Sequence, residues 1–177
     1  MIIKNGEVFQ EDGSFLVQEL YVENHKIVAS EAEVTDKTVI DATGLKVIPG
    51  LVDVHSHGAF GHDFSDADPE GLKVILKYEK NHGITSYCPT SMTLPAEELK
   101  EIFSTIKTVG EMKNGAFVRG INMEGPFLDA KKKGAHVEKY ICRPDAGFFR
   151  ELNEYSGNMV KLVTLAPNVE GAMEFID

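Results

Sequence analysis

Short apolar stretches dominate residues 1–49 and alternate with residues that favour tight turns. The turn dipeptides are Asn5-Gly6, Asp12-Gly13, Asn24-His25 and Thr43-Gly44. Asn-Gly and Asp-Gly pairs favour two-residue connections between antiparallel strands. The pattern therefore predicts a small antiparallel sheet in residues 1–49, and no cluster of catalytic residue types accompanies it.

From residue 49 onwards, short apolar runs alternate with amphipathic helical patterns. Strands are predicted at 51–54, 84–88, 117–123 and 159–166. Helices are predicted at about 69–83, from about 95 through 106, at about 144–154, and from 167 onwards. This alternation favours a parallel sheet, either open and doubly wound or closed as a (β/α)8 barrel. No glycine fingerprint for phosphate binding follows any predicted strand, which weakens a nucleotide-binding alternative.

The length of the chain limits how much of a barrel it can form. A complete (β/α)8 barrel takes about 250 residues, whereas the whole chain has 177. Residues 50–177 are enough for about four β/α units. We therefore expect half a barrel whose fourth strand has an unpaired edge.

The charge balance narrows the possible partners. The chain carries 28 acidic and 18 basic residues, giving a formal net charge of −10. Nucleic acids and anionic membranes both need a basic surface, so neither is expected as a partner. No apolar run approaches the roughly 20 residues that span a bilayer, and the N-terminus does not resemble a signal peptide. Two cysteines without metal-binding spacing fit a reducing compartment, so we expect a cytoplasmic protein.

A histidine pair follows the first strand predicted after residue 49. In Asp53-Val54-His55-Ser56-His57, the two imidazoles share one face because side chains alternate along a strand. Two neutral imidazoles can bind one cation. The carboxyl ends of barrel strands are also where barrel enzymes carry their active sites. The alternative interpretation is a pair of polar residues in an exposed loop.

A carboxylate ends the third predicted parallel strand. Glu124, in Asn-Met-Glu-Gly-Pro, would lie at the same edge of the sheet and could bind the same cation or act as a base. It could equally be a helix cap or an ion-pair partner. Further along, His136 follows Lys133-Gly134-Ala135 in a predicted loop, for which the alternative interpretation is a solvated segment.

Three segments carry a resemblance to a known family. They are PGLVDVHSHG (49–58), GITSYCPTS (83–91) and NMEGPFLDAKKKGAH (122–136). They resemble the N-acetylglucosamine-6-phosphate deacetylases of the amidohydrolase superfamily. The first motif is shared across the superfamily, whereas EGPF followed by KKGAH is specific to the deacetylases. The resemblance implies that residues 1–49 are strands of a small β-sandwich domain and that 50–177 form the first half of a metal-dependent TIM (β/α)8 barrel.

The resemblance also implies a reaction. Family members use a divalent metal, zinc or iron, to hydrolyse N-acetylglucosamine 6-phosphate to glucosamine 6-phosphate and acetate in amino-sugar catabolism. Glu124 matches their metal-binding glutamate. His136 matches the catalytic, substrate-binding histidine that helps to polarise the acetyl carbonyl. His55 and His57 match a position that varies between members holding one ion and members able to hold two, so both are candidate metal ligands.

Other family functions match no residue of this sequence. Two further histidine ligands, the aspartate that protonates the leaving amine and most phosphate contacts lie beyond the position of Asp177, with some phosphate contacts supplied by the second subunit of a homodimer. We therefore expect the 177-residue chain alone to be inactive. Two alternatives remain: another metal-dependent amidohydrolase acting on a cyclic amide or nucleobase, which leaves EGPF and KGAH unexplained, and a non-catalytic truncated product.

Overall fold

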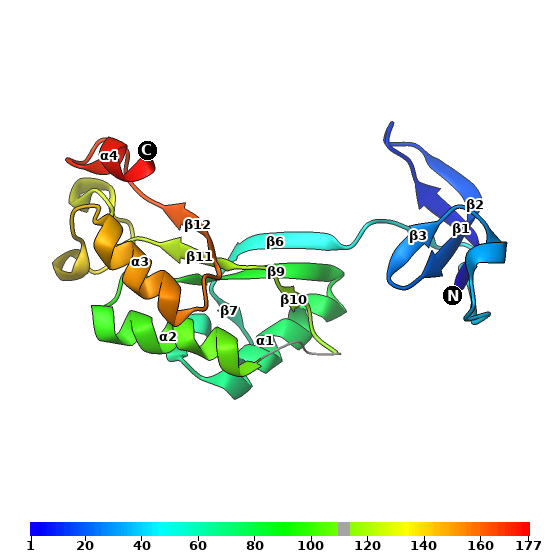
Figure 1. Cartoon of the computed structure of the whole chain (residues 1–177), viewed down its shortest axis with the longest axis horizontal. Helices are drawn as coiled ribbons and strands as arrows, with labels where there is room; N and C mark the ends of the chain where they lie inside the picture. The colour runs from blue at the N-terminus through cyan, green and yellow to red at the C-terminus, as the bar shows by residue number, and fades with distance from the viewer. Residues whose placement is uncertain (110–113) are drawn as a thin grey trace. The chain divides into compact units, whose positions relative to one another are not determined.

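The structure is a computed structural model that describes residues 1–109 and 114–177. The chain divides into two compact units, Met1–Pro49 and Gly50–Asp177 (Figure 1). The first unit contains five strands: β1 (Ile2–Phe9), β2 (Phe15–Glu23), β3 (Lys26–Val28), β4 (Val39–Asp41) and β5 (Lys46–Val47). They form one sheet in the order β3-β2-β1-β4, and β5 also pairs with β1.

The sheet of the first unit is mixed, so the prediction of an antiparallel sheet is wrong in part. β1, β2 and β3 pair antiparallel, joined by the predicted turns at Asp12-Gly13 and Asn24-His25. β4 and β5 pair parallel to β1 because the chain crosses over after β3, through a short 3-10 turn at Glu31–Glu33.

Asn5-Gly6 was also predicted as a turn, but it lies inside β1. Asn5 has a φ of 64°, and the register against β2 shifts between Ile3 and Gly6. The dipeptide therefore forms an irregularity within the strand, a conformation that uses the same left-handed backbone as a tight turn.

The second unit alternates strands and helices, as the sequence pattern predicts. Its main strands are β6 (Leu51–Ser56), β9 (Ile84–Ser91), β10 (Phe117–Val118), β11 (Ile121–Glu124) and β12 (Val160–Thr164). Its helices are α1 (Pro69–Asn81), α2 (Ala96–Val109), α3 (Ala146–Tyr155) and α4 (Ala172–Ile176). A small hairpin, β7 (Gly58–Ala59) and β8 (His62–Asp63), follows β6. 3-10 turns lie at Phe64–Asp66, Ala130–Lys132 and Glu138–Tyr140.

All pairings in the main sheet of the second unit are parallel. β6 pairs with β9, β9 pairs with both β10 and β11, and β11 pairs with β12. The third strand predicted from the sequence is thus interrupted at Arg119-Gly120, between β10 and β11. Parallel pairing brings the carboxyl ends of β6, β9, β11 and β12 to one edge of the sheet.

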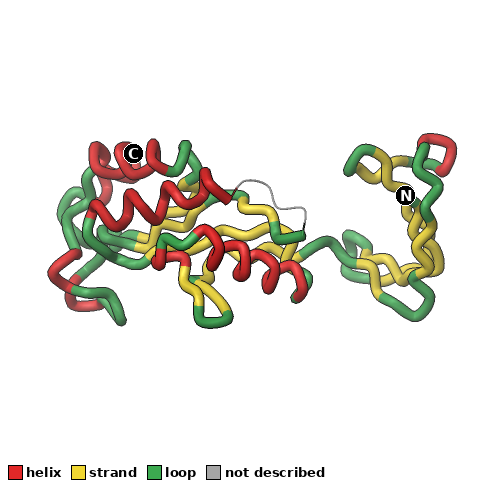
Figure 2. The backbone as a smooth tube through the Cα atoms, turned by 90° about the horizontal axis from the view of Figure 1, so that it is seen from below, coloured by secondary structure: helices red, strands yellow, loops and turns green. Residues whose placement is uncertain are grey.

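Helices α1, α2 and α3 lie along one side of this sheet (Figures 1 and 2). Asp68 caps α1 by accepting a hydrogen bond from Glu70 N, and Pro69 occupies the first turn. The apolar faces of the helices and the sheet form one buried core. It includes Leu72, Ile75 and Leu76 of α1, Leu99, Ile102, Phe103 and Ile106 of α2, and Tyr87, Ile121 and Met123 of the sheet. None of the helices in the two described ranges is long and apolar enough to cross a membrane.

The apolar run that begins the second unit is less buried than the sequence pattern predicts. Val52 is 64% exposed and Val54 is 45% exposed. Within the described ranges, β6 pairs with β9 alone, so β6 is an edge strand. The apolar run of β6 is typical of a buried parallel strand. It does form a parallel strand, but its side chains are largely exposed.

Candidate metal centre

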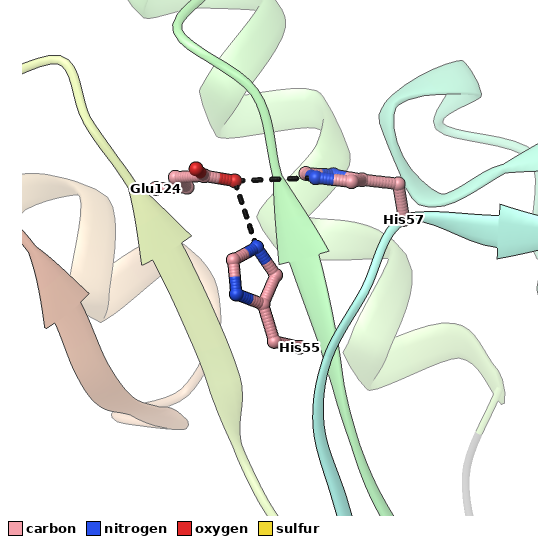
Figure 3. A group of neighbouring side chains, drawn as sticks. All are labelled: His55, His57 and Glu124. Carbon is pink, nitrogen blue, oxygen red and sulfur yellow. Dashed lines mark hydrogen bonds and ion pairs between the residues drawn. The ribbon is translucent and has the colours of Figure 1, made fainter. Parts of the chain in front are cut away.

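Three side chains from two strand ends converge at the carboxyl edge of the parallel sheet (Figure 3). His55 lies near the end of β6, His57 follows that strand directly, and Glu124 is the last residue of β11. The Nε2 atoms of both histidines lie 3.1 Å from Glu124 Oε2. Each residue offers one ligand atom, and these atoms all lie within 4.8 Å of one another. The group can hold a metal ion.

The backbone around Glu124 needs the glycine that follows it. Gly125 has a φ of +72°, which L side chains rarely adopt. A Cβ on this residue would also collide with the Thr93 hydroxyl. The chain can therefore turn away directly after Glu124 and leave the carboxylate facing the histidine pair.

The carboxyl group of Glu124 is largely buried. Burial acts to raise its pKa, but hydrogen bonds with His55 and His136, and the charge of those rings, outweigh burial. The net pKa of Glu124 lies below its usual value, so the group is an ionised carboxylate at neutral pH. An ionised carboxylate is the form that binds a cation.

A backbone carbonyl sets the tautomer of His57. Its Nδ1 lies 3.0 Å from the carbonyl oxygen of Thr90. A carbonyl oxygen only accepts, so Nδ1 carries the proton and donates. In the neutral ring, Nε2 therefore presents a lone pair towards Glu124.

That arrangement fits a bound cation. A neutral His57 Nε2 and the carboxylate of Glu124 are both acceptors, yet they lie 3.1 Å apart. Such a contact is stable only with a second proton on the ring or a metal ion beside the two atoms. Tetrahedral zinc with bonds of about 2.0–2.1 Å separates its ligand atoms by about 3.3 Å. The two histidines and the glutamate thus have the donor types and spacing of a divalent metal site.

His136 lies next to this group with the opposite tautomer. Its side chain is buried, so the interpretation as a solvated loop residue is wrong. The backbone N–H of Thr93 donates to its Nδ1 at 3.2 Å, which makes Nδ1 an acceptor. Nε2 therefore carries a proton in the neutral ring, and it lies 3.3 Å from Glu124 Oε1. His136 is arranged as a hydrogen-bond donor, whereas His57 is arranged as a ligand.

Two residues that set these tautomers have no counterpart among the sequence predictions. Thr90 and Thr93 act through their backbone carbonyl and N–H. Every residue type has a backbone carbonyl, and every type except proline has a backbone N–H. No residue pattern could therefore identify Thr90 and Thr93. Only the position of the last residues of β9 and the segment after it, next to both His57 and His136, reveals their part in the site.

The comparisons with known proteins agree on one family. No protein-family model matches the chain. N-acetylglucosamine-6-phosphate deacetylase of Bos taurus is 34% identical over 175 residues, which cover 93% of this chain and 42% of the bovine protein. The deacetylase of Bacillus subtilis is 30% identical over 182 residues, covering 99% of this chain and 43% of the bacterial protein. The chain therefore spans less than half the length of these relatives.

Solved structures give the same result. The N-acetylglucosamine-6-phosphate deacetylase of Pasteurella multocida aligns with a TM-score of 0.82 at 27% identity, covering 99% of this chain and 48% of that one. A mutant of the Mycobacterium smegmatis deacetylase, solved in complex with N-acetyl-D-glucosamine-6-phosphate, aligns with a TM-score of 0.79 at 26% identity and covers 99% and 46%. Over nearly its whole length, this chain is homologous to the N-terminal part of the N-acetylglucosamine-6-phosphate deacetylases.

Proposed function

We propose that this chain contributes the N-terminal part of a metal-dependent deacetylase that converts N-acetylglucosamine 6-phosphate to glucosamine 6-phosphate and acetate. One observation carries the proposal: His55, His57 and Glu124 converge at the carboxyl edge of a parallel sheet, in a chain homologous to deacetylases. The complex of the mycobacterial relative with the sugar phosphate supports the choice of substrate.

The proposal includes an architecture. We assign Met1–Pro49 to the strands of a small β-sandwich domain and residues 50–177 to the first half of a (β/α)8 barrel. The parallel sheet with alternating helices supports the second assignment, since a barrel is built from such units. The chain also covers 45–48% of solved deacetylases that it matches, which agrees with a protein about twice as long.

His55, His57 and Glu124 would hold the metal in this proposal. Two imidazoles and one carboxylate suit zinc or iron(II), and we leave open whether one or two ions bind. When bound, a divalent ion polarises a carbonyl and lowers the pKa of water towards neutrality. The ionised Glu124 would offset part of the charge of the ion, and it lies 3.1 Å from the Nε2 atoms of both imidazoles.

His136 would act as the catalytic and substrate-binding donor. Its Nε2 lies 3.3 Å from Glu124 Oε1, directly beside the group that would hold the metal. A donor at that place stabilises the negative charge that develops on the acetyl oxygen as the amide is attacked. The hydrogen bond from Thr93 N to Nδ1 keeps the proton on Nε2, where it is needed.

Two roles in the proposed reaction would belong to the part of the protein that matches the rest of the relatives' length. They are the proton donor for the leaving amine and the contacts to the phosphate of the substrate. We assign neither to a residue of this chain. The 177-residue chain alone is therefore expected to bind metal without releasing acetate.

A chimaera tests the proposal. The chain is fused to the part of the Bacillus subtilis deacetylase that follows the matched segment, loaded with Zn²⁺ or Fe²⁺, and assayed for acetate release. Release from N-acetylglucosamine 6-phosphate, absent in the same fusion carrying Glu124→Gln, would support the proposal. Hydrolysis of a cyclic amide or nucleobase in place of the sugar phosphate would reassign the substrate. A folded, metal-loaded fusion without any turnover would indicate a non-catalytic product.

A further inference from the structure

β6 leaves its regular ladder with β9 around His55, just before His57. β6 pairs with β9 at Asp53 and again at Ser56, and the register shifts between these two residues. Ser56 lies opposite Pro89, which has no backbone N–H to donate. The regular ladder between β6 and β9 is therefore interrupted between Asp53 and Ser56, in the stretch that holds Val54 and His55.

Two side chains, one from β9 and one from β11, donate hydrogen bonds to carbonyl groups at this irregularity. The hydroxyl of Tyr87, on β9, donates to the carbonyl oxygen of Ser56 at 3.0 Å. The side-chain amide of Asn122, on β11, donates to the carbonyl oxygen of Val54 at 3.0 Å. These two carbonyl groups flank His55. The backbone that carries both imidazoles is thus held on each side by a side chain from a more central strand.

Both donors are themselves held in place. Tyr87 is completely buried in the core between sheet and helices. Asn122 is 4% exposed, and its Oδ1 accepts a hydrogen bond from the hydroxyl of Thr164 at 3.5 Å. That contact orients the amide with its nitrogen towards Val54. In contrast, the His55 side chain is 52% exposed at the end of an edge strand.

We propose that Tyr87 and Asn122 are positioning residues of the metal centre, which hold the backbone at Val54 and Ser56 so that His55 and His57 face Glu124. The inference rests on the proposed metal-binding function. Neither residue belongs to the group that would hold the ion. Their effect is to reduce the conformational freedom that the two ligands lose on binding, and outer partners of this kind typically change metal affinity by about 10–100-fold.

Tyr87→Phe is the decisive variant, because it removes the hydroxyl and keeps the buried ring. Co²⁺ and Zn²⁺ affinities of the 177-residue chain are measured by titration, together with the visible spectrum of the Co²⁺ form. We expect Tyr87→Phe to bind about 10-fold more weakly with an altered Co²⁺ spectrum. Asn122→Leu, which removes the amide donor at similar volume, is expected to act in the same direction. Tyr155→Phe, which removes a hydroxyl from the partly exposed Tyr155 of α3, is the matched control and should match the wild type.

The same variants separate positioning from a merely structural role. A Tyr87→Phe chain that melts earlier but keeps the wild-type affinity and Co²⁺ spectrum overturns the inference. Long-range ¹H–¹⁵N spectra of the metal-free chain give a second readout. The wild type should show His57 protonated at Nδ1, and Tyr87→Phe should mix the two tautomers. If the wild type binds no metal, the proposed function fails, and unchanged imidazole spectra in Tyr87→Phe would then overturn the positioning role separately.

Discussion

The two strands that supply the candidate ligands, β11 and β6, differ in how they pair and in how deeply they are buried. β11 lies between β9 and β12, and its Ile121 and Met123 are completely buried. β6 pairs with β9 alone in the part of the chain that the structure describes, and Val52 is 64% exposed. One candidate ligand therefore comes from the buried interior of the sheet, and two come from its irregular edge. In the proposed site, β11 would fix where an ion binds, and the contacts that restrain β6 would determine how tightly it binds.

Removing the ligand on the interior strand should have the largest effect. Glu124→Gln keeps the shape of the side chain and removes the charge that attracts a cation. We expect the affinity for Zn²⁺ to fall by more than the roughly 100-fold that bounds the effect of outer partners. Isothermal titration of both chains measures the change. Glu138→Gln, which neutralises an exposed acid of the following loop, is the control, and equal losses in the two variants would point to general electrostatics.

Truncation on the same interior strand should destabilise the second unit strongly. Met123 is completely buried in the core, so Met123→Ala removes apolar contacts and leaves a cavity. The expected cost is about 2–5 kcal/mol in the free energy of unfolding. Urea denaturation monitored by circular dichroism provides the value. A cost below about 1 kcal/mol would mean that β11 is less tightly packed than its burial indicates.

A buried acidic residue on α1, Glu79, extends the comparison of buried and exposed positions from the strands to the helices. Glu79 is only 3% exposed, and burial raises the pKa of its carboxyl group, helped by the charge of Asp53 on β6. Because the pKa is higher in the folded state than in the unfolded state, folding disfavours the ionised form of Glu79. This loss of stability is present above the raised pKa and disappears as pH falls through it. Glu79→Gln should therefore raise the melting temperature at neutral pH, with a gain that shrinks on acidification. A gain independent of pH would contradict this explanation.

The smallest effect is expected on the edge strand. Val52→Ala shortens a side chain that is 64% exposed, so the free energy of unfolding should change by no more than about 0.5 kcal/mol. The same urea series that measures Met123→Ala measures this variant. A large destabilisation would show that β6 is covered in solution and would remove the contrast between the two strands.

Sequence patterns predict the positions of the candidate ligands better than they predict which of the surrounding residues are buried. The strand periodicity and the position of Glu124 at a strand end were enough to predict that His55, His57 and Glu124 meet at one edge of the sheet. The burial of His136 could not be predicted, because it depends on how a loop far along the chain covers the end of β9. The exposure of Val54 depends on which strands pair with β6, and composition carries no information about that pairing.

In the first unit as well, the sequence predicts only some of the strand pairings. The hairpin turns predict which strands pair antiparallel, because the turn residues are local to each connection. The parallel pairing of β4 and β5 with β1 depends on a crossover through Glu31–Glu33, and the turn dipeptides do not predict where the chain goes after it. Asn5-Gly6 has the residues of a tight turn and still lies inside a strand. Local residue preferences therefore predict local pairings and fail where tertiary contacts select between conformations.

Anomalous X-ray diffraction from crystals of the chain grown with Zn²⁺ would locate the metal itself. We expect a peak within bonding distance, about 2.0–2.2 Å, of the Nε2 atoms of His55 and His57 and of a carboxylate oxygen of Glu124. His136 should remain outside the coordination sphere, with its Nδ1 still accepting from Thr93 N. A zinc peak bound elsewhere, or three side chains without an ion in a zinc-saturated crystal, would contradict the assignment of this group as the metal centre.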